Sequence, residues 1–304
     1  MKIKFPPYLK KGDTICITCP AGYMAAEKAA TCIATLQSWG YNVSAGKTLG
    51  SASQNYFSGT DEERCTELQA MLDDKSINAI LFGRGGYGMS RIIDKLDFKK
   101  FKKNPKWLIG FSDITVIHTH LYSKYKIASL HAPMAAAFND GENTNEYIFS
   151  LKNNLEGKKA KYKCAIHPFN KQGSATSKLI GGNLSLLTHV IGTASDFETK
   201  NCILFIEDIG EYLYNIDRML LQLKRCGKLD KISGLIVGGF TDMKDTERPF
   251  GKTMDEIIKD AIAEYDFPVC FNFPVSHGKE NFALKIGAEY NLLVKNKVVV
   301  LQEL

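Results

Sequence analysis

The sequence lacks any uninterrupted apolar run close to the ~18 residues that a membrane-spanning helix needs. Low-complexity tracts and internal repeats are also absent. The first residues, MKIKFPPYLKKGD, contain no apolar segment of the kind that secretory signals carry. We therefore expect a globular protein of the cytoplasm.

Clustered positive charge is scarce, although 39 Lys and Arg against 33 Asp and Glu give a net charge of +6. The densest basic run, DFKKFKKNPK at 97–106, is short, and we interpret it as a solvated helix end and loop. A nucleic-acid-binding face would need clustered basic residues with stacking aromatics, or a known module. We expect neither a nucleic-acid nor a membrane partner.

The eight cysteines are scattered, and several lie in apolar runs, as buried free thiols do in a reducing compartment. The C-x-x-C formed by Cys16 and Cys19 has no second pair. His118 and His120 are two apart in a helical segment, so they cannot share a helix face as metal ligands. The sequence thus contains neither a candidate metal cluster nor a Walker motif.

The 304 residues, 44% hydrophobic and 24% charged, suffice for two domains. Up to about residue 140, short apolar strands alternate with helical segments, which predicts a parallel sheet covered on both faces. Thr60 and Glu63 form a capping box at the start of one helix. The expected strands and helices of this half are 13–19, 25–40, 41–47, 60–74, 77–83, 89–96, 106–111, 113–125 and 127–133.

The pattern weakens after about residue 140, where a polar stretch predicts a helix and a linker. Two alternating runs around Lys295-Asn296 close the chain and predict a hairpin. The expected elements between them are strands at 202–208 and 232–240 and helices at 214–227 and 253–265. We predict an α/β protein with an N-terminal domain at 1–150, a linker at 151–177 and a C-terminal domain at 178–304.

A glycine-rich turn, Gly83-Arg84-Gly85-Gly86-Tyr87-Gly88, follows a strand and precedes a helix. It matches the dinucleotide-binding pattern G-x-G-x-x-G, and Asp113 follows the next strand as a candidate ribose ligand. The turn comes after the third strand, however, and two of its residues are bulky. It can also direct backbone N–H groups at a developing oxyanion, or it is simply a tight turn.

The buried strand in KWLIGFSDIT, residues 106–115, ends abruptly at Ser112-Asp113. Either residue can cap the following helix, or Ser112 can be a nucleophile held at a sharp turn. These residues alone favour both interpretations equally.

A nucleophilic serine needs a base, and the base needs a group that fixes its tautomer. Of the six histidines, His277 lies in a loop between two strands and is the best candidate base. Glu207 stands where an apolar strand ends and can orient that histidine. Ser112, His277 and Glu207 are the constellation with a complete chemical logic. They come from both expected domains, so we expect a site between them.

These residues and their surroundings resemble the LD-carboxypeptidase family, serine peptidases that remove the terminal D-alanine of murein tetrapeptides. A branch of that family cleaves the toxic microcin C adenylate. The segments that carry the resemblance are LKKGDTICITCPAG, GRGGYGMSRIIDKLD, IGFSDIT, LHAPM, IGGNLSLLTHVIGT, ILFIEDIGEYLYNIDRMLLQL and FPVSHGKENFALKIG.

The resemblance implies that Ser112 is the nucleophile, Glu207 the orienting acid and His277 the base. It implies that Gly86 and Asp113 supply backbone N–H groups to the oxyanion. It further implies a C-terminal domain rich in β-structure, a homodimer, and no metal or cofactor. Arg84 can pair with a substrate carboxylate or form a structural ion pair.

Three positions depart from the family pattern, although none removes a catalytic group. Ser276 stands where a glycine usually precedes the histidine, Ala132 replaces a glycine, and Ala21 follows Pro20 in place of a serine. We expect a carboxypeptidase that cleaves the L,D-peptide bond of murein tetrapeptides. The alternatives are a self-immunity peptidase acting on peptidyl-adenylates and, from another class, a dinucleotide-binding protein that uses the 83–88 turn.

Overall fold

The computed structural model describes residues 2–139 and 145–304, which form two compact units. The first unit is Met1–Lys158 with Phe282–Lys285, and the second is Lys159–Asn281 with Ile286–Leu304. Residues 140–144, near the start of the expected polar stretch, lie outside the described residues.

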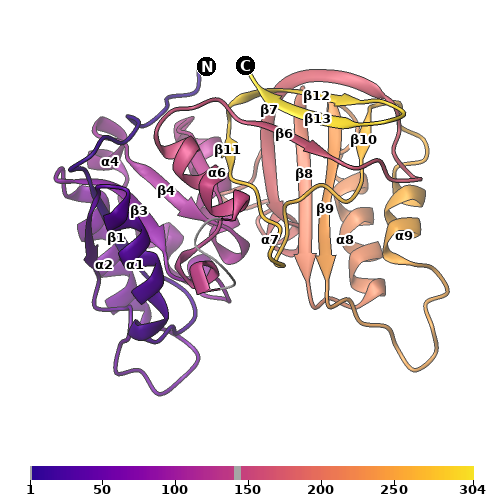
Figure 1. Cartoon of the computed structure of the whole chain (residues 1–304). Helices are drawn as coiled ribbons and strands as arrows, with labels where there is room; N and C mark the ends of the chain where they lie inside the picture. Colours follow the sequence, from indigo (N-terminus) through magenta and orange to yellow (C-terminus); the bar gives the residue numbers. More distant parts are fainter. Residues whose placement is uncertain (1, 140–144) are drawn as a thin grey trace. The chain divides into compact units, whose positions relative to one another are not determined.

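The first unit is built on a six-stranded sheet in the order β11-β5-β4-β3-β1-β2 (Figure 1). Strands β1 to β5 pair in parallel, as the alternation of strands and helices predicted. Their apolar residues build the core, and the Trp107 side chain is fully buried. The strands of this sheet are β1 Thr14–Thr18, β2 Asn42–Ala45, β3 Ile77–Phe82, β4 Trp107–Gly110, β5 Ser129–His131 and β11 Leu284–Ile286.

Helices connect the parallel strands of this unit. The predicted capping box is confirmed, because Thr60 Oγ1 accepts from the N–H of Glu63 and Glu63 Oε2 accepts from the N–H of Thr60. The α-helices are α1 Ala30–Ser38, α2 Asp61–Asp73, α3 Met89–Ile92, α4 Lys99–Lys103, α5 Thr115–His120 and α6 Glu146–Leu155. The short 3-10 and π segments are η1 Ala26–Ala29, η2 Ile93–Lys95, η3 Ser112–Ile114, η4 Leu121–Tyr125 and η5 Ala135–Asn139.

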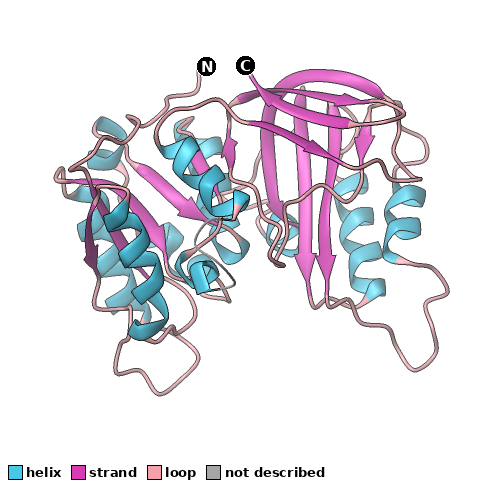
Figure 2. Cartoon of the chain, in the orientation of Figure 1, coloured by secondary structure: helices cyan, strands magenta, loops and turns pink. Residues whose placement is uncertain are grey.

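The second unit holds a seven-stranded sheet in the order β10-β9-β8-β7-β12-β13-β6, and its long strands are plain in Figure 2. Strands β7 to β10 are parallel, whereas β12, β13 and β6 join them antiparallel. The strands are β6 Lys161–Cys164, β7 Gly173–Asn183, β8 Cys202–Ile209, β9 Gly234–Thr241, β10 Val269–Cys270, β12 Glu289–Val294 and β13 Val299–Glu303. The helices are α7 Leu184–His189, α8 Leu213–Arg225 and α9 Met254–Ala261.

The two edge strands of this second sheet approach each other. Cys164 on β6 and Cys270 on β10 are in contact, with 3.7 Å between their sulfur atoms. An isolated bridge between Lys171 and Val269 reinforces the approach. The sheet therefore curls on itself, which covers edges that would otherwise be open for pairing.

Two expectations about the chain's organisation are wrong. Residues 151–177 do not form a linker, because they contain the end of α6, strand β6 and the first part of β7. The hairpin around Lys295-Asn296 is confirmed as β12 and β13, but β11, which lies within the expected C-terminal domain at 178–304, belongs to the sheet of the first unit.

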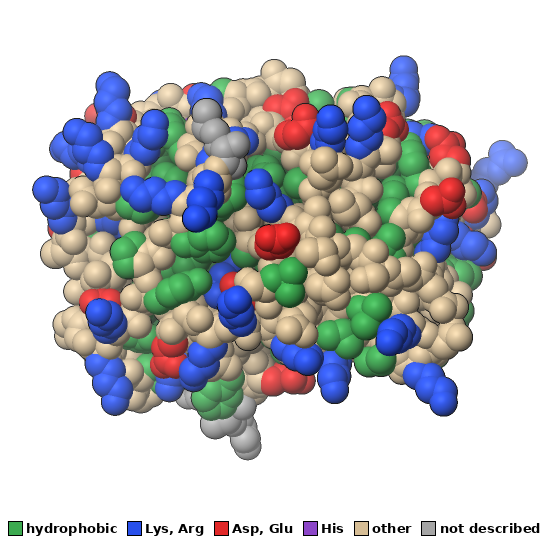
Figure 3. Space-filling model, turned by 90° about the horizontal axis from the view of Figure 1, so that it is seen from above, with side chains coloured by type: hydrophobic (Ala, Val, Ile, Leu, Met, Phe, Trp, Pro, Cys, Tyr) green, Lys and Arg blue, Asp and Glu red, His purple; other side chains and the backbone are tan. Residues whose placement is uncertain are grey.

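No helix in the described ranges is both long and apolar enough to pass through a membrane. On the face seen in Figure 3, Lys and Arg side chains are spread among Asp and Glu and do not form a stripe. That distribution agrees with the interpretation of the net charge, and the absence of a nucleic-acid partner stays a prediction.

Candidate active site

Ser112 stands where strand β4 gives way to a helix, and its backbone conformation is unusual. Its φ angle is +64°, a left-handed conformation that costs a residue with a side chain of order 1–3 kcal/mol. The strand before it is fully buried, and the helical segment η3 begins at Ser112 itself. A strained serine at a strand-to-helix turn has the geometry of a nucleophile elbow, which exposes the hydroxyl.

The interpretation of Ser112 or Asp113 as a simple helix cap is wrong, because neither side chain caps this helix. The buried carboxylate of Asp113 instead accepts a hydrogen bond from the N–H of Met89, at 2.7 Å. Burial raises the pKa of Asp113 to about 6, and the N–H groups of Met89 and Gly88 oppose that rise. Asp113 therefore ties the glycine turn to the serine turn, which argues against its proposed role as a ribose ligand.

The glycine turn lies directly against Ser112. A Cβ atom added to Gly85 would stand 2.8 Å from both Cβ and Oγ of Ser112, and 3.5 Å from the backbone nitrogen of Asp113. Gly86, the next residue, has a φ angle of +106°, which strongly favours glycine. The backbone of the turn can approach the serine this closely only because Gly85 has no side chain.

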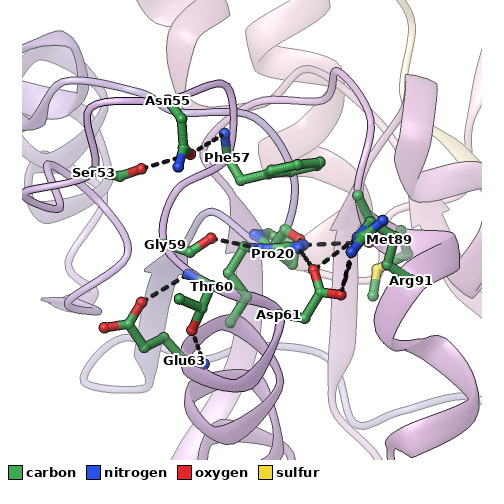
Figure 4. Close-up of polar contacts among 12 residues, drawn as sticks. Pro20, Ser53, Asn55, Phe57, Gly59, Thr60, Asp61, Glu63, Met89 and Arg91 are labelled. Atoms are coloured by element: carbon green, nitrogen blue, oxygen red, sulfur yellow. Dashed lines mark hydrogen bonds and ion pairs between the residues drawn. The ribbon is translucent and has the colours of Figure 1, made fainter.

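A buried arginine holds the loops around this turn in place. The Arg64 guanidinium donates hydrogen bonds to the carbonyl oxygens of Pro20, Gly59 and Gly88, and it pairs with Asp61. Asp61 also forms an ion pair with Arg91, which Figure 4 shows. Arg91 Nη2 and Asp61 Oδ2 are 2.8 Å apart. The loops after β1 and β3 are thus fastened to the start of α2.

Arg84, one of the two bulky residues of the glycine turn, is exposed. Its Nη1 atom donates a hydrogen bond to the carbonyl oxygen of Tyr23, at 3.0 Å. No carboxylate of the described residues lies within ion-pair distance of its guanidinium. The structural ion pair that the sequence left open is therefore not formed within the described part of the chain.

Glu207 and His277, 70 residues apart in the sequence, meet in the second unit. His277 Nδ1 and Glu207 Oε2 are 2.6 Å apart, and Glu207 is fully buried at the end of β8. Burial alone would lower the pKa of His277, but the negative charge and hydrogen bond of Glu207 outweigh it and raise the pKa. With its Nδ1–H donated to the carboxylate, the neutral imidazole carries its basic lone pair on Nε2.

Two glycines that sequence reasoning missed bring the histidine loop to Glu207. The pairing of β8 with β9 shifts register beside Glu207, opposite Gly238 and Gly239. An added Cβ would stand 2.2 Å from the carbonyl oxygen of Val275 at Gly238, and 2.5 Å from Cβ of Ser276 at Gly239. The signal available in the sequence was a glycine pair inside a strand, which marks a bulge or a close backbone approach.

Ser276, which departs from the family pattern, stabilises the loop that carries the histidine. Its hydroxyl accepts from the N–H of Gly278 at 3.0 Å and donates to the carbonyl oxygen of Glu280 at 2.9 Å. The same loop borders a cavity of about 460 Å³ within the second unit. The departure is therefore compatible with an ordered His277.

Asp208, beside Glu207 on β8, is a second buried carboxylate. It accepts hydrogen bonds from Asn183 Nδ2 at 2.7 Å and from the N–H and hydroxyl of Ser185 at 2.9 and 2.7 Å. It thereby joins the end of β8 to the start of α7. Its negative charge also contributes to the raised pKa of His277.

The other histidines have structural surroundings. His118 is fully buried and its Nε2 lies 2.8 Å from the carbonyl oxygen of Gly110. Burial lowers the pKa of His118 and of the buried His120 to about 4. His131 is buried at the end of β5, His167 lies 3.5 Å from Asp255, and His189 ends α7. Within residues 2–139 and 145–304, no group of metal-ligating side chains has gathered.

The structure thus brings the candidate residues together in two groups. Ser112 and Asp113 lie at one turn of the first unit, and Gly86 lies in the glycine turn that packs against it. Glu207 and His277 form a hydrogen-bonded pair in the second unit. The first group offers a nucleophile with nearby backbone N–H groups. The second offers a base with a fixed tautomer.

Both halves of the chain match known family models. The LD-carboxypeptidase N-terminal domain matches residues 15–132, and the LD-carboxypeptidase C-terminal domain matches residues 176–292. A probable murein peptide carboxypeptidase of Bacillus subtilis is 33% identical over 300 residues, covering 98% of this chain and 94% of the relative.

Solved structures show the same fold. A muramoyltetrapeptide carboxypeptidase from Oxalobacter formigenes superposes with a TM-score of 0.86 at 28% identity, covering 95% of this chain and 98% of that one. The microcin C7 self immunity protein MccF, in complex with aspartyl sulfamoyl adenosine, gives a TM-score of 0.87 at 24% identity over 98% of each chain. At that identity, the likeness to MccF concerns the fold alone.

Proposed function

Because this chain belongs to the LD-carboxypeptidase family, we propose that it is a serine carboxypeptidase that releases the terminal D-alanine of murein tetrapeptides. The observation that carries the proposal is the 2.6 Å contact between His277 and the buried Glu207. A buried carboxylate that orients a loop histidine is the arrangement that activates a serine nucleophile. Ser112 in its strained turn supplies that nucleophile.

In the proposed mechanism, neutral His277 takes the hydroxyl proton of Ser112 as Oγ attacks the scissile carbonyl carbon. That carbonyl links an L-configured centre to D-alanine. The N–H groups of Gly86 and Asp113 receive the oxyanion. As the C–N bond breaks, His277 gives its proton to the amine of D-alanine, and water then hydrolyses the acyl-enzyme.

The substrate is tested with defined peptides. We expect the purified protein to release D-alanine from a murein tetrapeptide, detected by mass spectrometry of the products, and to leave the diastereomer ending in L-alanine intact. A peptidyl-adenylate analogue in a parallel reaction tests the self-immunity function, which rests on likeness of fold alone. Hydrolysis of the adenylate without release of D-alanine would replace the first proposal by the second.

A second test concerns the contact between the glycine turn and the nucleophile. Gly85→Ala should lower kcat about 100-fold, because the new methyl group displaces Ser112 Oγ and such a small misplacement costs about that factor. Gly234→Ala is the matched control, since Gly234, like Gly85, does not have a positive φ angle and the nearest contact of an added Cβ there is the end of the Leu292 side chain, at 3.3 Å. Steady-state kinetics on the tetrapeptide compare the two, and equal rates would contradict the role of Gly85.

The homodimer that the family resemblance implies stays a prediction, as do the cytoplasmic location and the absence of a cofactor. Arg84 as a substrate-binding residue is likewise part of the proposal.

A further inference from the structure

The strand order of the first sheet marks a place for a ligand. Along β2-β1-β3-β4-β5 the order reverses between β1 and β3. Open α/β sheets bind ligands beyond the carboxyl ends of the two strands that flank such a reversal. Gly22 follows β1 and the 83–88 turn follows β3, so both lie at this reversal.

Arg84 brings a positive charge to this reversal, and no ion pair with the described residues neutralises that charge. Two nearby arginines, Arg64 and Arg91, both pair with Asp61, whereas Arg84 has no carboxylate partner among the described residues. Its only hydrogen bond to the described part of the chain uses Nη1, which donates to the carbonyl oxygen of Tyr23. Most of its donor groups are therefore left for a ligand.

Tyr56 places a hydroxyl beside the same turn. Its side chain is 55% exposed, and its hydroxyl oxygen lies 2.9 Å from where a Cβ would stand on Gly86. The hydroxyl makes no hydrogen bond to the residues that the structure describes. The hydroxyl of Tyr56 thus lies beside Gly86, whose N–H the proposed mechanism assigns to the oxyanion.

Hydrogen bonds and a guanidinium–ring contact hold the loop that carries Tyr56 in place. Asn55 Oδ1 accepts hydrogen bonds from the Ser53 hydroxyl and the N–H of Phe57, as Figure 4 shows. The Phe57 ring lies under the guanidinium of Arg64, 4.8 Å from the ring centre. The N–H of Tyr23 donates to the carbonyl oxygen of Tyr56 at 3.0 Å.

Arg84 and Tyr56 converge on Gly22. An added Cβ on Gly22 would stand 3.4 Å from Arg84 Nε, and the Cβ position of Gly86 is 3.5 Å from Gly22 Cα. Because neither glycine carries a side chain, the guanidinium and the phenol border the same stretch of bare backbone.

The proposed function requires a carboxylate-binding group at this location. In a peptide that ends in D-alanine, three bonds separate the terminal carboxylate carbon from the scissile carbonyl carbon, a span of at most about 4 Å. A group that binds that carboxylate must therefore lie next to the N–H groups that bind the oxyanion. We propose that Arg84 and Tyr56 bind the terminal carboxylate of the substrate and so make the enzyme an exopeptidase, an inference that rests on the proposed function.

The test compares a tetrapeptide ending in free D-alanine with the same peptide ending in D-alanine amide. Wild-type enzyme should cleave the acid with a kcat/KM about 10- to 150-fold above that of the amide, the range typical of hydrogen bonds to a charged group. Arg84→Met should lower kcat/KM for the acid by a similar factor, mainly by raising KM. It should change kcat/KM for the amide less than about threefold. Tyr56→Phe should lower kcat/KM for the acid about 10-fold.

Arg225→Met is the matched control, because it removes an exposed arginine from the end of α8 and the same unit of net charge. It should keep the wild-type preference for the acid. Arg84→Lys, which retains the charge, should recover part of that preference, and thermal unfolding checks that each variant is folded. Equal cleavage of acid and amide by wild-type enzyme would overturn the inference and leave the proposed function standing. Cleavage of neither would overturn both.

Discussion

Replacing Ser112 by alanine is expected to lower kcat on the murein tetrapeptide about 10⁶-fold, the size of loss seen when a triad serine is removed. The reason is chemical, because alanine leaves no atom to form the acyl-enzyme. The surrounding turn is fastened independently by Asp113 and Arg64, so the variant should fold and still bind substrate. Release of D-alanine followed over hours against a no-enzyme blank measures the remaining rate.

Ser112→Gly separates the chemistry from the backbone conformation. Because it also lacks the hydroxyl, this variant should lose activity as fully as the alanine variant. Glycine adopts a φ of +64° without steric strain, so the variant should unfold at a higher denaturant concentration than the wild-type protein. A gain of about 1 kcal/mol in the free energy of unfolding is expected from relief of the left-handed conformation. Loss of function together with a gain in stability is typical of residues kept for catalysis.

Substantial activity in Ser112→Ala would identify another nucleophile and contradict the proposed mechanism. A stability gain in the alanine variant equal to that in Ser112→Gly would show that the serine conformation is not strained. The two measurements test the role of the hydroxyl and the role of the turn separately.

The sequence predicted the parts of the site that depend on strand ends. A buried apolar strand followed by a polar residue is visible in KWLIGFSDIT and in CILFIEDIGE, and both Ser112 and Glu207 lie at the ends of parallel strands. The even choice at Ser112 between cap and nucleophile could not be settled from these residues. The φ angle of +64° favours the nucleophile that we propose, and no pattern of side chains encodes that angle for a serine.

The sequence did not predict what depends on long-range packing. Gly238 and Gly239 fit the pattern of an ordinary strand, because their importance lies in the histidine loop that packs on them from more than thirty residues away. Strand β11 is three buried residues long, too short for its alternation to say which sheet it joins. The carboxylate of Asp113 bonding to Met89 is likewise a contact between two turns that only the folded sheet brings together.

Glu207→Gln is expected to lower kcat about 10⁴-fold while leaving the fold intact, as loss of the orienting carboxylate does in a serine triad. A glutamine amide can donate to His277 Nδ1, which places the imidazole proton on Nε2, where it blocks acceptance of the serine proton. Glu198→Gln, in the exposed loop before β8, is the matched control and should retain the wild-type rate.

The pH dependence of Glu207→Gln distinguishes an orienting role from a merely structural one. Glu207 raises the pKa of His277, so in the wild-type enzyme the acidic limb of kcat/KM should lie above the usual histidine pKa. The base works only when neutral, so activity falls as pH drops through that limb. Without the carboxylate, burial dominates and lowers the pKa, and the limb of the glutamine variant should move to lower pH. A limb that stays in place would mean that Glu207 does not set the charge of His277.

The double variant that combines Glu207→Gln with Ser112→Ala should be no slower than Ser112→Ala alone, because residues that act as one unit lose their effect together.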